Sequence, residues 1–225
     1  KMPEEINRVI TDHLSNLLFC PTAVSVANLK KEGVVEGVHL VGDVMYDATL
    51  SSLQKAPTLE AIFRQLDFKE ENYVLATVHR AENTDDSRRL AEILDYIDEQ
   101  AEAPVLMPLH PRTKKRIQEF GLDLRNVYAV DPVGYLEMIT LIKNAEKIYT
   151  DSGGMQKEAY FLRTPCVTLR DETEWVETIN CGWNRLWSVP DYQEHTEITE
   201  YGSGNAASTI VDIICRYFKD RCGSE

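Results

Sequence analysis

The central part of the chain alternates between short apolar runs and longer stretches in which apolar residues recur every three or four positions. The apolar runs are continuous and rich in β-branched residues, which is typical of strands buried on both faces. We expect strands at residues 38–41, 73–78, 105–109, 127–130, 147–150 and 166–169. Helices fit the stretches at roughly 44–54, 59–66, 87–100, 112–120, 134–144 and 154–162. This alternation predicts an α/β fold whose parallel sheet is flanked by helices on both faces.

Shorter elements are predicted at the two ends of the chain. A first helix fits residues 3–14, since Pro3 suits the first helical position. A short strand at 17–20 and a helix at 22–31 follow. After a polar, turn-rich segment, a last amphipathic helix fits residues 205–218. Its apolar side requires a surface to pack against.

Composition narrows the classes of function. With 225 residues, 43% of them hydrophobic, the chain can bury one core and part of another. The 24 Lys and Arg residues are outnumbered by 37 Asp and Glu residues, which gives a formal net charge of −13. Such an acidic surface argues against general binding to nucleic acids or membranes. An anionic ligand must therefore be held locally, by backbone amides and a few placed cations.

The cysteines and the start of the chain bear on location and completeness. The five cysteines have no CxxC spacing, and Cys166 falls within a predicted strand, so we expect reduced thiols. We find no run of about 18 apolar residues and no signal-peptide pattern, and therefore expect a cytoplasmic protein. The chain opens with Lys1-Met2 and enters a helix at once, so we expect an N-terminal truncation.

Polar loops follow the predicted strands, at the sheet edge where α/β proteins bind ligands. The strand at 147–150 leads into Ser152-Gly153-Gly154, which opens a helix. Adjacent glycines let a ligand approach the backbone, and the first N–H groups of a helix bind phosphate. Glu158 follows about one turn later, where it can accept hydrogen bonds from a diol such as a ribose. The alternative is an ordinary turn in which Ser152 only caps the helix.

Two histidine–arginine pairs follow neighbouring strands. His79 and Arg80 stand after one strand, and His110 and Arg112 after the next. Both His79 and Arg80 can bind phosphate oxygens, and His79 can also protonate or orient a leaving diphosphate. The alternative is a loop that only caps a helix. The five histidines show no HxxxH or HxH spacing, so we predict no metal site and no cofactor.

Two further residue groups can complete such a site. The segment 131–138 places a proline and a glycine around exposed backbone, which can bind the edge of a planar base. Met138 or Tyr135 can pack on the face of that base, although Met138 also suits the core. Arg170, which follows the last predicted strand, either meets a phosphate or pairs with the acidic residues around it.

Four motifs occur in an order that resembles one enzyme family. They are Met2-Pro3-Glu4-Glu5-x-Asn7-Arg8, Thr77-Val78-His79-Arg80-Ala81-Glu82-Asn83, Asp151-Ser152-Gly153-Gly154-x-Gln156-x-Glu158-Ala159 and Arg170-Asp171-x-Thr173-Glu174. Together they resemble the non-hydrolysing UDP-N-acetylglucosamine 2-epimerases, from residue 2 to about residue 219. The family has a GT-B-like architecture of two Rossmann-like halves, with the UDP-sugar in the cleft.

The resemblance implies a division of the chain into three parts. Residues 1–35 would be the remnant of the N-terminal Rossmann-like domain, and residues 36–190 the C-terminal UDP-binding Rossmann-like domain. Residues 191–225 would form a linker and a helix that crosses back to the N-terminal domain. The full-length protein would be a homodimer.

The resemblance also implies a reaction, the interconversion of UDP-GlcNAc and UDP-ManNAc. Elimination of UDP gives a 2-acetamidoglucal, and UDP adds back after proton exchange at C2. Carried over by position, the substrate-binding residues are His79, Arg80, Val133, Met138, Ser152, Gly153, Gly154, Glu158 and Arg170. The serine and the glycines would hold the diphosphate beside His79, while Glu158 would bind the ribose.

The resemblance also implies a uracil site and a catalytic base. Val133 and Met138 would flank the uracil. The family's carboxylate bases lie in the N-terminal half, so Glu4 or Glu5 is the acidic candidate for catalysis beside His79. The chain by itself would then be inactive. Alternatives are a 2-epimerase of a modified UDP-sugar such as UDP-2,3-diacetamido-glucuronate, a GT-B glycosyltransferase or a nucleotide-binding module.

Overall fold

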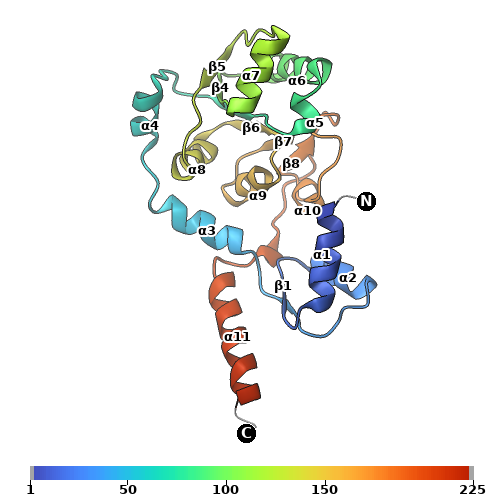
Figure 1. Cartoon of the computed structure of the whole chain (residues 1–225). Helices are drawn as coiled ribbons and strands as arrows, with labels where there is room; N and C mark the ends of the chain where they lie inside the picture. Colours follow the sequence, from blue (N-terminus) through green and yellow to red (C-terminus); the bar gives the residue numbers. More distant parts are fainter. Residues whose placement is uncertain (1–2, 223–225) are drawn as a thin grey trace. The chain divides into compact units, whose positions relative to one another are not determined.

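The computed structural model describes residues 3–222, without the side chains of residues 3, 4, 200, 221 and 222. The chain forms two compact units, one made of Ser52–Glu197 and the other of Lys1–Ser51 together with Ile198–Glu225 (Figure 1). Within residues 3–222, every helix is too short or too polar to span a membrane.

The larger unit is built on a sheet of six parallel strands, which confirms the predicted α/β fold. The strands are β3 (Val74–Thr77), β4 (Val105–Pro108), β5 (Val127–Val130), β6 (Lys147–Thr150), β7 (Cys166–Thr168) and β8 (Asn184–Leu186). Their order across the sheet is β5-β4-β3-β6-β7-β8. The edge strand β8 was not predicted because it is polar: buried Asn184 accepts a hydrogen bond from Thr168 and donates one to Thr178.

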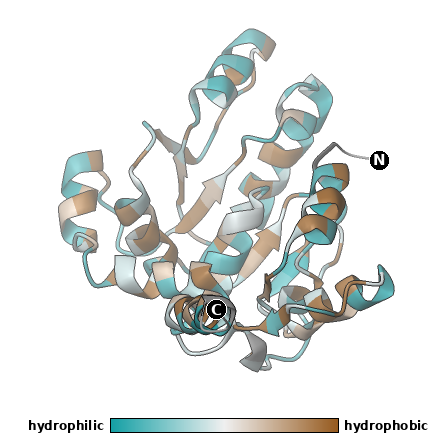
Figure 2. Ribbon diagram, turned by 60° about the horizontal axis from the view of Figure 1, so that its bottom comes forward, coloured by the Kyte–Doolittle hydropathy of each residue, from teal (hydrophilic) through white to brown (hydrophobic). Residues whose placement is uncertain are grey.

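Helices cover both faces of this sheet. Residues of α6 (Ser87–Gln100) and α7 (Pro111–Phe120) share one core with Val74 and Ala76. Residues of α4 (Leu59–Leu66), α8 (Tyr135–Asn144) and α9 (Gly153–Phe161) share the other core with Tyr73 and Leu75. Successive residues of β3 therefore face opposite layers, as the pleat of a strand requires. Figure 2 shows hydrophobic residues on the strands and hydrophilic residues along much of the helices.

The strand order reverses at the centre of the sheet. From β3 the chain proceeds to β4 and β5 on one side, and from β6 it proceeds to β7 and β8 on the other. Thr77 and Thr150 are paired at the ends of β3 and β6, and their hydroxyls are hydrogen-bonded at 2.7 Å. The loops that leave these two strands diverge, and such a switch point is where open α/β sheets bind ligands. Short helices follow two strands, α5 (Ala81–Thr84) after β3 and α10 (Val176–Asn180) after β7.

The smaller unit contains a separate two-stranded parallel sheet. Its elements are α1 (Pro3–Leu14), β1 (Leu18–Cys20), α2 (Ala23–Lys31), β2 (Val38–Leu40), the 3-10 turn η1 (Thr199–Tyr201) and α11 (Ala206–Cys222). Most of α3 (Val44–Leu53) also belongs to this unit. The expectation that residues 38–41 belong to the large sheet is wrong, because β2 pairs with β1. Val38 packs with Leu18, Cys20 and Leu29 in a small core. The expected boundary at residue 36 therefore falls inside this unit.

Two segments far apart in the sequence are joined within the smaller unit. The carboxylate of Asp47 accepts hydrogen bonds from the backbone N–H groups of Ala206 (3.2 Å) and Ala207 (2.7 Å). These N–H groups begin α11 and have no partner inside the helix. Nearby, the N–H of Asp43 donates to the carbonyl of Tyr201. The start of α11 is thus capped by a side chain from α3.

Replacing Asp47 by Ala should loosen the start of α11, since the two N–H groups lose their acceptor. We expect the free energy of unfolding to fall by about 1 kcal/mol and the amides of residues 206 and 207 to exchange faster with solvent. Asp47→Asn retains an oxygen acceptor and should recover most of the loss. Unchanged amide exchange in the alanine variant would contradict the capping role.

Candidate functional site

One buried carboxylate joins the two loops at the switch point. Asp151, which follows β6, is fully buried and accepts hydrogen bonds from the backbone N–H groups of His79 (3.0 Å) and Arg80 (2.9 Å). The side-chain amide of Asn83 donates to the same carboxylate (3.1 Å). Hydrogen bonds of this kind are needed to bury a charge. The sequence analysis did not select Asp151 or Asn83, although an acidic residue directly before the Ser-Gly-Gly turn is a usable signal.

The same carboxylate orients His79. The imidazole Nδ1 lies 3.2 Å from Asp151 Oδ1, and the side chain is 44% exposed. A carboxylate at Nδ1 favours a proton on that nitrogen, so Nε2 is the atom available to a ligand. The ring of His110 lies 6.5 Å from that of His79 between centroids. The structure thus brings together histidines from the ends of β3 and β4.

A pocket of about 260 Å³ opens beside these histidines. Its lining includes four residues of the predicted site, His79, Val133, Met138 and Ser152. Met155, which the sequence analysis did not select, also lines it, together with Thr77, Val78, Pro108, His110 and Pro132. An apolar wall with a few polar groups at one end suits a flat ring that carries a charged group.

The turn at the start of α9 combines a helix cap with free backbone N–H groups. Ser152 is the N-cap, and its Oγ accepts a hydrogen bond from the N–H of Met155 at 3.4 Å. Ser152 thus caps the helix, as the alternative interpretation of the sequence requires, and it also lines the pocket, so a role in binding stays a prediction. Gly153 and Gly154 supply the first two N–H groups of the helix, which have no acceptor within it. Such groups at the positive end of a helix dipole favour an anion.

Glu158 is more buried than the sequence suggests. Glu158 is only 9% exposed. It is not among the described residues that line the pocket. Burial raises the pKa of its carboxyl above the ordinary value, and a hydrogen bond with Tyr135 partly opposes that rise. A carboxylate has about four acceptor positions, so this hydrogen bond leaves capacity for a second donor.

The two predicted arginines lie in a charged cluster with two glutamates. The Arg170 guanidinium is 2.7 Å from Glu174 and 3.7 Å from Glu82. The Arg80 guanidinium is 3.8 Å from both glutamates. The alternative in which Arg170 pairs with neighbouring acids is thus what the structure shows. Any phosphate that binds these arginines must replace one of those contacts.

The candidate bases lie on α1, in the smaller unit. The carboxylate of Glu5 accepts two hydrogen bonds from Arg8, at 2.8 and 3.0 Å. Arg8 also binds Asp12 and Glu32, both at 2.6 Å. The side chain of Glu4 lies outside the described residues. A catalytic role for either glutamate stays a prediction.

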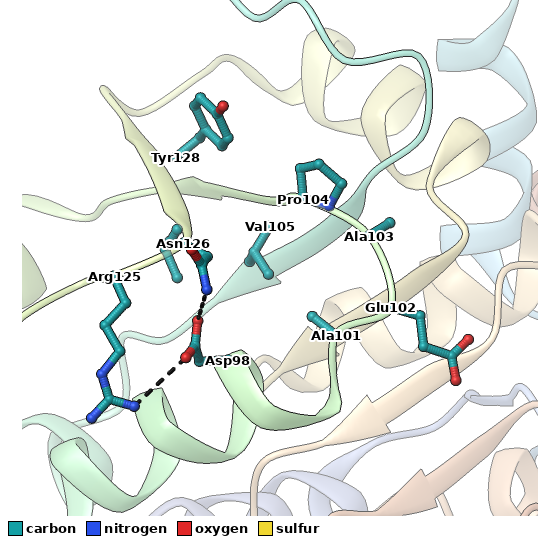
Figure 3. Close-up of a pocket in the computed structure, with 10 residues that line it drawn as sticks. Asp98, Ala101, Glu102, Ala103, Pro104, Val105, Arg125, Asn126 and Tyr128 are labelled. Carbon is teal, nitrogen blue, oxygen red and sulfur yellow. Dashed lines mark hydrogen bonds and ion pairs between the residues drawn. The ribbon is translucent and has the colours of Figure 1, made fainter.

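A second hollow, of about 530 Å³, lies where strands β4 and β5 begin, at the opposite edge of the sheet (Figure 3). Arg125, which lines this hollow, is already paired with two carboxylates, Asp95 at 2.9 Å and Asp98 at 3.6 Å. The side-chain amide of Asn126 also donates to Asp98 (3.1 Å). The pairing of these groups, and the position of the hollow away from the strand ends, leave the pocket beside His79 as the stronger candidate.

The sequence is similar to those of known epimerases. The family profile for UDP-N-acetylglucosamine 2-epimerase matches residues 1–215. The chain is 46% identical to the UDP-N-acetylglucosamine 2-epimerase of Methanocaldococcus jannaschii, over 95% of this chain and 64% of that protein. It is 44% identical to the UDP-2,3-diacetamido-2,3-dideoxy-D-glucuronate 2-epimerase of Pseudomonas aeruginosa, over 96% of this chain and 64% of that protein. The chain thus spans about two-thirds of the length of these relatives.

Solved structures show the same likeness. The crystal structure of the Methanocaldococcus jannaschii enzyme in complex with UDP-GlcNAc and UDP matches 96% of this chain and 65% of that one, with 39% identity and a TM-score of 0.81. The Neisseria meningitidis enzyme bound to UDP-GlcNAc matches 95% of this chain and 65% of that one, with 28% identity and a TM-score of 0.78. From the profile match, the identities and the shared fold, this chain belongs to the UDP-N-acetylglucosamine 2-epimerase family.

Proposed function

We propose that this chain supplies the UDP-binding half of an enzyme that interconverts UDP-GlcNAc and UDP-ManNAc. The observation that carries the proposal is the convergence of His79, Ser152 and the apolar wall of Val133 and Met138 on one pocket at the switch point. A related structure contains UDP-GlcNAc and UDP, which supports a nucleotide-sugar as the ligand.

The chemistry requires help for the leaving group. Elimination breaks the bond between the sugar and UDP, so negative charge grows on the diphosphate in the transition state. The N–H groups of Gly153 and Gly154 and the imidazole of His79 can stabilise that charge, and this lowers the barrier. Asp151 lies at the Nδ1 of His79, which leaves Nε2 available. When the ring carries a proton on both nitrogens, Nε2–H can donate a hydrogen bond or a proton to a phosphate oxygen. Removal of the C2 proton needs a base, for which Glu4 and Glu5 remain the candidates.

The nucleoside would occupy the apolar end of the pocket. We place the uracil between Val133 and Met138, and the ribose hydroxyls at the Glu158 carboxylate, which also bonds with Tyr135. By the same proposal, the smaller unit belongs to the N-terminal domain of the family and the larger unit to the C-terminal domain. The homodimer and the cytoplasmic location expected from the sequence also stay predictions.

A second substrate is supported by one comparison. The Pseudomonas aeruginosa relative, 44% identical, acts on a UDP-2,3-diacetamido-2,3-dideoxy-glucuronate, and its ligand carries the same UDP group. The identity to the UDP-N-acetylglucosamine 2-epimerase of Methanocaldococcus jannaschii is 46%. The two identities are so similar that they do not decide which of the two sugars is the substrate. Binding of UDP cannot distinguish them, whereas turnover of each sugar can.

The reaction is tested by proton NMR in D2O, with UDP-GlcNAc and a protein that joins this chain to an N-terminal half of the family. We expect the signal of the C2 proton to disappear as solvent deuterium enters, and UDP-ManNAc to form. Transfer of the sugar to an acceptor without exchange at C2 would instead indicate a glycosyltransferase. Turnover of the diacetamido-glucuronate substrate alone would select the second candidate.

The binding site is tested by calorimetry with UDP and this chain. Ser152→Ala removes one hydroxyl and should cost about 1 kcal/mol of binding free energy, roughly a fivefold loss of affinity. Glu158→Ala should also weaken binding, since the ribose loses its acceptor. Ser188→Ala, at an exposed position of the same unit, is the matched control and should bind UDP normally. If both site variants retain the wild-type affinity, the proposed site is wrong.

The buried Glu158 also predicts a dependence of stability on pH. Because burial raises the pKa of the folded carboxyl, the folded chain binds this proton more tightly than the unfolded chain does. The free energy of unfolding therefore falls as pH rises from about 4.5, the ordinary value, through the raised pKa. Glu158→Gln removes this cost, so the variant should be more stable than wild type at pH 8 and equal to it at pH 4.

Urea unfolding at the two pH values measures this effect. The exposed Glu60 on α4 serves as the control, since Glu60→Gln should change stability little at either pH. The gain in Glu158→Gln should be accompanied by weaker UDP binding, because the site has lost its carboxylate. An equal stability of Glu158→Gln and wild type at pH 8 would show that the carboxyl is not destabilised by burial.

A further inference from the structure

Glu174 lies where a phosphate is expected. A Cβ atom placed on Gly153 would be 2.6 Å from Glu174 Oε1, so this carboxylate oxygen stands directly against the first residue of α9. The N–H groups at the start of a helix attract anions, and a carboxylate is an anion of suitable size. A side chain at position 153 would displace the carboxylate of Glu174 from this place.

Two cations complete the surroundings of this carboxylate. Arg170, whose side chain is only 11% exposed, is 2.7 Å from Glu174 Oε2, and Arg80 is 3.8 Å from Glu174 Oε1. Burial alone would raise the pKa of Glu174, but its hydrogen bonds with its own backbone N–H and with Arg170 lower that pKa below the ordinary value. The side chain is therefore negatively charged at neutral pH.

A buried donor beside Glu174 points to a ligand. The indole Nε1 of Trp175 would be 3.3 Å from the same Cβ position on Gly153. This N–H is buried and has no hydrogen-bond partner among the described residues. A buried donor without an acceptor costs free energy, and a phosphate oxygen at the start of α9 would supply one.

We propose that Glu174 is a specificity-determining residue: its partly exposed carboxylate occupies the phosphate position at Gly153 and is displaced only by a phosphate attached to a nucleoside. The inference rests on the proposed function, because it takes the diphosphate of UDP to bind at this turn. An incoming phosphate must displace the carboxylate from Gly153 and from Arg80 and Arg170. The nucleoside part of UDP, held against Val133 and Met138, provides free energy for that displacement. Inorganic phosphate and pyrophosphate lack this part and are excluded.

The experiment measures the binding of UDP, uridine and inorganic pyrophosphate to Glu174→Gln. Removing the negative charge should tighten UDP binding about tenfold and let millimolar pyrophosphate compete with UDP, while uridine binds as in wild type. In the wild-type chain, pyrophosphate at the same concentration should not compete. Weaker or unchanged UDP binding in Glu174→Gln, or no competition by pyrophosphate, would overturn the proposal and leave Glu174 as a structural partner of Arg170.

Two further variants make the test specific. Glu82→Gln removes the same charge from the same two arginines, but Glu82 is farther from Arg170 and is not among the atoms nearest Gly153. This control should not admit pyrophosphate. Glu174→Asp keeps the charge on a shorter side chain that withdraws from Gly153, so it should admit pyrophosphate even if Glu174→Gln does not fold. Absence of UDP binding in the wild-type chain would refute the proposed function itself, whereas normal UDP binding without these differences refutes only the role of Glu174.

Discussion

The candidate site depends on the carboxylate of Asp151. This group is buried at the centre of the sheet, where it accepts hydrogen bonds from two backbone N–H groups and from the amide of Asn83. The imidazole Nδ1 of His79 lies 3.2 Å from it. Loss of one partner of a buried charge is far more costly than loss of a surface ion pair. These hydrogen bonds tie the loop after β3 to Asp151 and place His79 beside the pocket in the absence of a ligand.

The negative net charge of the chain limits how the proposed site could hold an anion. The chain has a net charge of −13, and in the proposed site the groups that would hold an anion are helix N–H groups and two arginines that are already paired with Glu82 and Glu174. Balanced arginines can be buried without an unpaired charge. By the proposal, they would become available to a phosphate that takes the place of a glutamate.

Much of the fold follows from the local pattern, because buried strands and amphipathic helices carry their own signals. The helix at Pro3–Leu14 and the strand at Val127–Val130 have the predicted bounds. Strand β8 lacks an apolar run, since Asn184 is buried through hydrogen bonds. The pairing of β2 with β1 was missed because a short apolar run does not indicate which strand it will join.

The site was predicted by a topological rule, since parallel strands bring their ends to one edge. This rule correctly brought His79 and Ser152 to one pocket, but it contains no information on contacts between side chains. The hydrogen bonds of Asp151 join residues about 70 positions apart, and the approach of Glu174 to Gly153 depends on how the loop after β7 folds back. Glu158 likewise forms a hydrogen bond with Tyr135, a residue of another helix.

The central pairing of β3 with β6 has a consequence for how the chain folds. The hydroxyls of Thr77 and Thr150, 73 positions apart in the sequence, meet only after the helices and strands between them have formed or collapsed. Contacts of such long range are entropically costly to close and slow the folding of a domain. The pocket beside His79 contains residues from the ends of both strands, so it is complete only once this pairing has closed, and ligand binding at this pocket would report on completion of the sheet.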